Sequence, residues 1–169
     1  MKMLDKMRST YMVPLWTIVR IWLGVQWLTA GWGKAFGNFD ATGYLKGAIG
    51  KASGENPIVK GWYAAFLEGF ALPNVELFNF LVAWGEVAVG LGLILGAFTT
   101  VALYAGAFMN LNFLLAGTIS TNPILLTVAF ILLGMGTAAY AWGVDRYMMP
   151  WLKGLVVNFN RNDRKAKAN

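Results

Sequence analysis

The stretch VAWGEVAVGLGLILG, residues 82–96, contains one carboxylate, Glu86, among residues that are otherwise apolar, aromatic or glycine. A helix that is apolar on every face lies in a membrane or in the core of a large protein. An ionised carboxylate in such surroundings is costly unless it has a polar partner or lies in a wet cavity. Glu86 therefore predicts a polar group or a cavity beside this helix.

The composition extends this pattern to the whole chain. Of the 169 residues, 57% are hydrophobic and 13% are charged, whereas soluble domains carry about 25% charged residues. We therefore predict an all-α integral membrane protein in which residues 1–169 form a single domain. The net charge of +6 does not indicate a nucleic-acid partner, because the cations gather at the two ends and in one loop, as in membrane proteins.

The chain contains no cysteine and no histidine. It therefore offers no thiolate for an iron–sulfur cluster, no imidazole for haem and no Cys/His set for zinc, and we expect no metal cofactor. If the protein carries out redox chemistry, the electrons must reside on bound organic molecules or on a partner chain.

Four segments are apolar enough and long enough to span a bilayer, which takes about 20 residues. They cover residues 13–33, 78–97, 100–117 and 123–142. The connection between the first two is long, and its aromatic second half predicts a helix that lies at the membrane interface. Residues 150–169 begin with helical amphipathic spacing and end in a basic tail. The sequence thus predicts a four-helix membrane bundle with an interfacial helical segment in the first outer loop and an amphipathic C-terminal helix.

Lysine and arginine residues are most frequent near the two ends of the chain. An even number of spanning helices places both ends on one side of the membrane, and the positive-inside rule makes that side cytoplasmic.

A few polar residues interrupt the apolar helices. Their positions predict one layer near mid-depth that holds Glu86, Gln26 and one or both of Asn110 and Asn112, with Arg20 below it. In this arrangement Glu86 pairs with Arg20, or Gln26 and an asparagine hold it across the bundle. Such a layer is either a structural clasp that fixes helix register or a site where the carboxylate exchanges a proton.

Three further residues are candidates for ligand contact. Lys34 is predicted at the outer end of the first helix, where it either extends toward water or attracts an anion. Trp27 and Trp84 are deep enough to flank a flat ligand, whereas most tryptophans here fit an interfacial belt.

Several stretches resemble the DoxX/DoxD membrane family. They are RIWLGVQWLTAGWGKAF (20–36), GEVAVGLGLILGAFT (85–99) and YAWGVDRY (140–147). NPIVKGWYAAFL (56–67) and FMNLNFLLAGTISTNP (108–123) resemble the DoxD branch. That branch includes the large subunit of thiosulfate:quinone oxidoreductase, which couples oxidation of thiosulfate to tetrathionate with reduction of a quinone.

The resemblance implies a thiosulfate dehydrogenase (quinone) in the plasma membrane of a prokaryote. It implies Lys34 as the site for thiosulfate or a related small sulfur anion, and Glu86 as the proton donor to the quinone, with Arg20 tuning Glu86. A small second subunit and a homo-oligomer are the partners that it implies besides lipid. The quinone would lie among Trp27, Trp84, Gln26, Asn110 and Asn112.

Two other functions stay open at this point. A small-solute carrier could use the same polar layer as its path, although four helices are few for one carrier chain and no inverted repeat is evident. A membrane anchor or scaffold for other oxidoreductases would use Glu86 only as a clasp.

Overall fold

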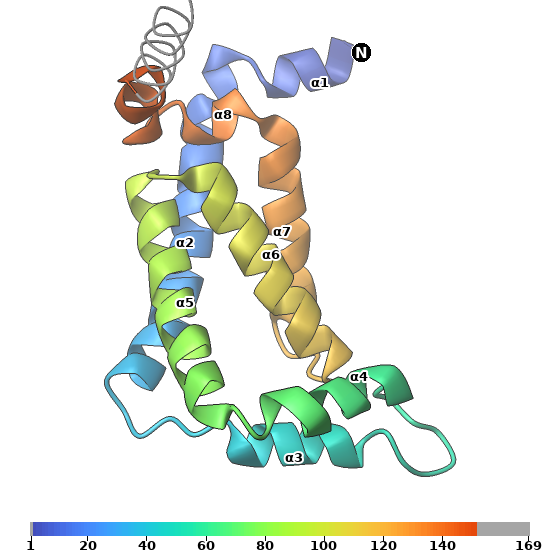
Figure 1. Ribbon diagram of the computed structural model, residues 1–169. Coiled ribbons are helices and arrows are strands. Elements are labelled where there is room, and N and C mark those ends of the chain that lie inside the picture. Colours follow the sequence, from blue (N-terminus) through green and yellow to red (C-terminus); the bar gives the residue numbers. More distant parts are fainter. Residues whose placement is uncertain (1, 152–169) are drawn as a thin grey trace, which may run out of the picture.

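The computed structural model describes residues 2–151, and four long helices dominate it (Figure 1). α2 packs against α5 and α7, and α6 packs against the same two helices, so the four close into a bundle. The described residues contain no strand, which confirms the all-α prediction. The four helices are α2 (Val13–Ala35), α5 (Val75–Leu95), α6 (Thr99–Leu115) and α7 (Asn122–Met135).

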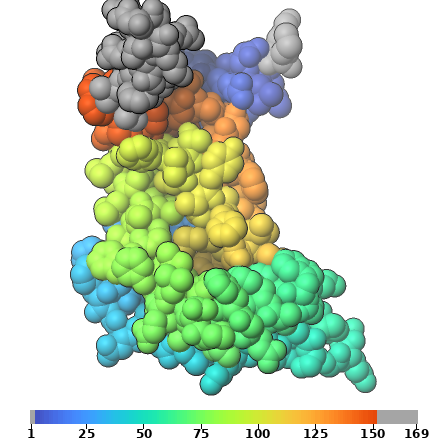
Figure 2. All heavy atoms as spheres, in the orientation of Figure 1, coloured from blue at the N-terminus to red at the C-terminus, as the bar shows by residue number. Residues whose placement is uncertain are grey.

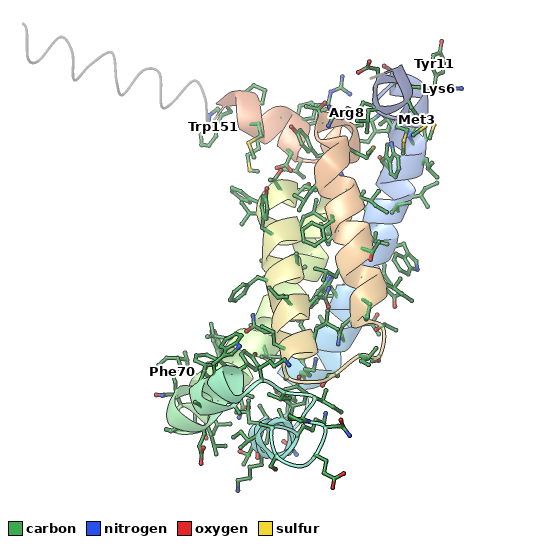
Figure 3. All side chains as sticks on the ribbon, turned by 90° about the vertical axis from the view of Figure 1, so that its right-hand side faces the viewer. Met3, Lys6, Arg8, Tyr11, Phe70 and Trp151 are labelled. Carbon is green, nitrogen blue, oxygen red and sulfur yellow. The ribbon has the colours of Figure 1, made fainter. Side chains whose placement is uncertain are left out.

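Short helices cover both ends of the bundle. One end, here called the α1 end, carries α1 (Lys2–Met7), η1 (Thr10–Met12), α8 (Thr137–Tyr140) and a helical turn over residues 145–151. The opposite end, the α3 end, carries α3 (Thr42–Gly50), α4 (Gly61–Phe66) and the π-helix η2 (Leu67–Ala71). Figure 3 shows Arg8 and Trp151 together at the α1 end and Phe70 at the α3 end, and Figure 2 shows that α3 and α4 form a layer wider than the bundle.

The long connection after α2 is more helical than the sequence analysis predicted. Its aromatic second half is α4 and η2, as expected, but its glycine-rich first half also forms a helix, α3. The Ala41 amide at the start of α3 donates a hydrogen bond to Asn79 Oδ1 of α5 (2.8 Å). This bond joins the start of α3 to α5, so that α3 lies across the end of the bundle.

The fourth long helix ends earlier than predicted. The prediction placed it over residues 123–142, but α7 stops at Met135. The reason is Gly136, whose φ of +57° lies in the left-handed region that glycine adopts without strain. The apolar sequence continues beyond this residue, but the helix does not.

Close packing of α2 on α5 depends on glycine. A Cβ atom on Gly90 would stand 2.5 Å from the backbone nitrogen of Leu28, and one on Gly24 would stand 2.9 Å from the Gly90 carbonyl oxygen. Any larger residue at these positions would force the two backbones apart.

The outward faces of the bundle are apolar. Ile18, Phe80, Val101 and Phe130, one from each long helix, are between 58% and 66% exposed. Among the described helices, α5 alone has both the length and the composition needed to cross a membrane, while α6 and α7 are apolar but shorter. The amphipathic helix predicted for residues 150–169 falls almost wholly outside the described residues.

Candidate functional site

The partner of Glu86 is Lys34. The Lys34 ammonium lies 2.6 Å from Glu86 Oε1 and 2.5 Å from Oε2, so it donates to both carboxylate oxygens. The Glu86 side chain is only 2% exposed, whereas that of Lys34 is 29% exposed. The expected pairing of Glu86 with Arg20 is wrong, because Arg20 lies at the other end of α2.

The antiparallel register of α2 and α5 explains this pairing. Gly24 lies against Ile94, Leu28 against Gly90, and Gly31 against Val87. The numbers in each of these three pairs sum to 118, as expected for two antiparallel helices in one register. This register brings the last turn of α2, which carries Lys34, next to Glu86.

Arg20 instead holds the α1 end together. Its side chain is 1% exposed, and its guanidinium donates to the carbonyl oxygens of Ala139 (3.1 Å) and Trp142 (2.7 Å). A Cβ atom on Gly96 would stand 2.6 Å from Arg20 Nη1, so the guanidinium fills the space that this glycine leaves. We conclude that Arg20 ties α2 to the chain that follows α7.

A cavity of about 760 Å³ extends from the ion pair toward α3 and α4. Cavities of about 300–1,000 Å³ are typical of sites for small organic ligands. The walls are mainly aromatic and aliphatic, with polar groups at a few points. The lining includes Gln26, Trp27, Lys34, Tyr44, Tyr63, Glu86, Asn110 and Asn112.

Asn110 is the unsatisfied polar group in this cavity. Its side chain is 0% exposed, and neither Oδ1 nor Nδ2 has a hydrogen-bond partner among the described residues. A buried amide without partners costs about 1–3 kcal/mol, so it calls for an explanation, such as a functional role or a bound water molecule or ion. Asn110 therefore presents one donor and one acceptor to whatever occupies the cavity.

Aromatic side chains form the walls around this amide. Trp27 is 3% exposed and lines the cavity, and the absence of a side chain at Gly106 of α6 makes room for its indole, since a Cβ atom there would stand 3.2 Å from the ring. The Lys34 ammonium lies 5.6 Å from the ring centroid of Phe39 and 5.9 Å from that of Phe113, within cation–π range.

Asn112 reaches the same cavity although it lies two residues from Asn110. The sequence left open whether one or both asparagines reach the layer of Glu86, and both line the cavity. The Tyr63 hydroxyl of α4 lies 3.0 Å from Asn112 Oδ1 and 3.1 Å from its carbonyl oxygen, and Asn112 Nδ2 donates to the Phe108 carbonyl. Asn112 thus links α6 to the α3 end, while Asn110 stays free for a ligand.

Two tyrosines complete the site and were missed from the sequence. Tyr44 of α3 and Tyr63 of α4 both line the cavity. Burial raises the pKa of Tyr63 to about 12, and burial also raises the pKa of Tyr44, whose hydroxyl accepts a hydrogen bond from Thr118. The sequence placed both tyrosines only in the long loop between the first two predicted helices. Nothing in that loop indicated where it folds back against the bundle.

Two groups of exposed residues in the lining differ in polarity. Phe66, Leu81 and Phe108 form an apolar group on α4, α5 and α6, and their side chains are 38%, 50% and 67% exposed. Figure 1 shows that α5 and α6 diverge toward the α3 end. A second group is polar and consists of Thr29 of α2 with Ser120 and Thr121 of the α6–α7 connection.

Not every residue predicted for the site lies in it. The structure brings together Gln26, Trp27, Lys34, Glu86, Asn110 and Asn112. Trp84 is 43% exposed and packs on the outside of the bundle against Phe36 and Phe80, with ring centroids 5.7 and 6.5 Å away. Trp84 and Arg20 therefore do not contact the cavity.

The part of the chain that the structure describes contains no cluster of carboxylate, histidine or cysteine side chains that could hold a metal ion. Neither the curated proteins nor the solved structures include a match to this chain. Residues 15–119 match the DoxX family. This region covers more than half of the chain and runs from α2 into the α6–α7 connection. The chain therefore belongs to the DoxX family of membrane proteins.

Proposed function

We propose that this chain is the membrane subunit of an oxidoreductase that reduces a quinone in the cavity, with a small sulfur anion such as thiosulfate as the electron donor. The observation that carries the proposal is Asn110, a fully buried amide without partners inside a mainly aromatic cavity. The DoxX membership and the resemblance to the DoxD branch make a quinone the favoured ligand.

In this proposal α2, α5, α6 and α7 span the membrane, and the α1 end is cytoplasmic. The exposed apolar faces of the four helices support contact with lipid, since soluble surfaces rarely expose such large apolar patches. The basic residues at the α1 end support its cytoplasmic location. α3 and α4 then lie at the outer interface.

Asn110 can serve both redox states of a quinone. The Nδ2 group donates to a quinone carbonyl, and Oδ1 accepts from the hydroxyl of the reduced form. Trp27 lines the same cavity and gives a flat ring an aromatic surface. The apolar group formed by Phe66, Leu81 and Phe108 offers a route from lipid for a hydrophobic tail.

The polar part of the lining suits the donor. Oxidation of two thiosulfate ions to tetrathionate releases two electrons, and reduction of a quinone consumes two electrons and two protons. Lys34 is the cation that attracts the anion, and Glu86 is the carboxyl group that supplies a proton. Arg20 has no role in this chemistry because it lies at the α1 end. The electrons pass directly between the bound substrates or through a second subunit.

The first test uses titration calorimetry to measure the binding of a soluble quinone analogue to the purified chain in detergent. We expect Asn110→Leu, which keeps the size but removes both polar atoms, to weaken binding at least tenfold. Tyr104→Leu is the control, because Tyr104 lies on the same helix but is 61% exposed and does not line the cavity. Equal binding by both variants and the wild-type chain would remove the quinone from this cavity.

The second test follows quinone absorbance when thiosulfate is added to the same sample. Bleaching that depends on thiosulfate and on Lys34 identifies a self-sufficient enzyme. Binding without bleaching means that electron transfer needs the second subunit. Solute flux in vesicles without any quinone would instead identify a carrier.

A further inference from the structure

The ion pair leaves Lys34 in contact with the cavity and Glu86 without access to water. Lys34 donates to both oxygens of Glu86 from one side, and 29% of its side chain remains exposed. Glu86 is 2% exposed, and Lys34 is the one donor that reaches its carboxylate among the described residues. The ammonium is thus the place where an entering anion would bind.

An anion at this place meets the charge of Glu86 at short range. Two negative charges in a buried site disfavour each other strongly, and the usual outcome is that one group takes up a proton. Because thiosulfate is a dianion, the ion pair and the bound anion together would carry a charge of −2, and a proton on Glu86 reduces this charge to −1. We propose that the cavity takes up an anion together with one proton, the anion binding to Lys34 and the proton to the Glu86 carboxylate.

No other group of the cavity is suited to take this proton. Four ionisable side chains line it, namely Lys34, Glu86, Tyr44 and Tyr63. Burial raises the pKa of each tyrosine, so both stay neutral between about pH 6 and pH 8. α6 and α7 bring no ionisable side chain to the lining, and Arg20 lies at the α1 end.

This inference rests on the proposed function for the identity of the anion and adds an order of events to it. The arrival of the donor anion loads Glu86 with a proton while the acceptor occupies the same cavity. One of the two protons that the quinone needs is then in place before the electrons move, and the second comes from water. The two substrates are coupled through one carboxyl group.

The test is titration calorimetry of thiosulfate into the purified full-length chain. Measurements at one pH in two buffers with different ionisation enthalpies give the number of protons taken up per anion, and we expect one. Between about pH 6 and pH 8 the Kd should rise about tenfold per pH unit wherever free Glu86 is ionised. Sulfate, which is not oxidised, should show the same proton uptake.

Variants separate the two members of the pair. Glu86→Gln mimics the protonated carboxyl group, and its thiosulfate Kd should be independent of pH with no proton uptake. Lys34→Gln should lose binding at least tenfold, while Lys34→Arg should retain it. The wild-type buffer comparison decides the matter even if a variant fails to fold.

Two results would overturn the inference. Thiosulfate binding without proton uptake by the wild-type chain would show that the two binding events are not coupled. Absence of any thiosulfate binding would show that Lys34 does not form an anion site. Quinone binding measured in the same sample tests the proposed function by itself. A chain that binds quinone but shows either of these results would disprove only the coupling.

Discussion

Gly31 lies opposite Glu86 where α2 and α5 approach closely, and a Cβ atom on Gly31 would stand 2.8 Å from the Cβ atom of Glu86. The same Cβ atom would stand 2.6 Å from the backbone nitrogen of Val87. Because backbone cannot rotate away as a flexible side chain can, a methyl group there must move the helices. The position of the carboxylate relative to Lys34 therefore depends on a residue without a side chain.

Gly31→Ala should destabilise the protein by about 1–3 kcal/mol through overpacking and should lengthen the contact between Lys34 and Glu86. Gly33→Ala is the matched control, because nothing lies within 4 Å of a Cβ atom at that position. There alanine replaces glycine inside a helix and should stabilise it by up to about 1 kcal/mol. Denaturant unfolding in detergent measures both, and equal effects would contradict the close approach.

The two halves of the ion pair should respond unequally to mutation. Lys34→Met leaves a buried carboxylate without a partner and should cost about 3–5 kcal/mol. Glu86→Gln should cost less, because the ammonium of the partly exposed Lys34 can turn toward water in the cavity. The double variant Lys34→Met/Glu86→Gln should recover much of the loss, because it leaves no buried charge without a partner. Additive effects in this cycle, measured by unfolding, would mean that the two side chains do not interact.

The two exposed groups of the cavity lining should differ in their access to water. The chain has no cysteine, so each introduced cysteine is the single thiol of its variant. In vesicles, Thr29→Cys should react with a membrane-impermeant maleimide, as should Ser120→Cys in the α6–α7 connection. Phe108→Cys should react only with a lipid-soluble reagent. The same reactivity at Thr29 and Phe108 would show that the two groups do not face different surroundings.

Asp145 should contribute to stability at the α1 end. Its carboxylate accepts hydrogen bonds from the amides of Phe98 and Thr99, both at 2.7 Å, where α6 begins. Asp145→Asn replaces one acceptor oxygen with a donor and should cost about 1–3 kcal/mol. Arg146→Gln, a change at the exposed neighbouring residue, should have little effect in the same unfolding measurement.

Tyr63 should give the α3 end a dependence on alkaline pH. The pKa of Tyr63 is about 12 in the folded protein and about 10 in an unfolded chain. The folded state holds the proton more tightly, so this contribution to stability is complete below pH 10 and is lost as the pH rises toward 12. The stability difference between the wild-type chain and Tyr63→Phe should therefore be constant up to about pH 10 and shrink above it. A constant difference up to pH 12 would place the hydroxyl in water.

The positions of the long helices could be predicted from hydropathy because each apolar run begins and ends near polar or turn residues. α2 and α5 each start within three residues of the prediction. The end of α7 could not be predicted in this way, because hydropathy does not register the left-handed backbone of Gly136. The need of Glu86 for a polar partner or a cavity could be predicted, but the apolar pattern around it did not identify the partner.

The partner of Glu86 depends on helix register, and a signal for that register was present. Gly24 and Gly31 on α2 and Gly90 on α5 allow the close approach, because a Cβ atom on each would stand within 3 Å of the facing backbone, and this register places Lys34 beside Glu86. The tyrosines of the cavity left no such signal. They reach it through α3 and α4, and contacts between distant segments, such as that of Tyr63 with Asn112, leave no periodic pattern in the sequence.

The early end of α7 has a consequence for the surrounding lipid. A helix of 14 residues rises about 21 Å, whereas the hydrocarbon layer is about 30 Å thick. In the proposed orientation the bilayer beside α7 must therefore compress, or short-chain lipids or the helix of another subunit must fill the mismatch. A change in membrane thickness would then affect this protein at the surface where α7 meets the lipid.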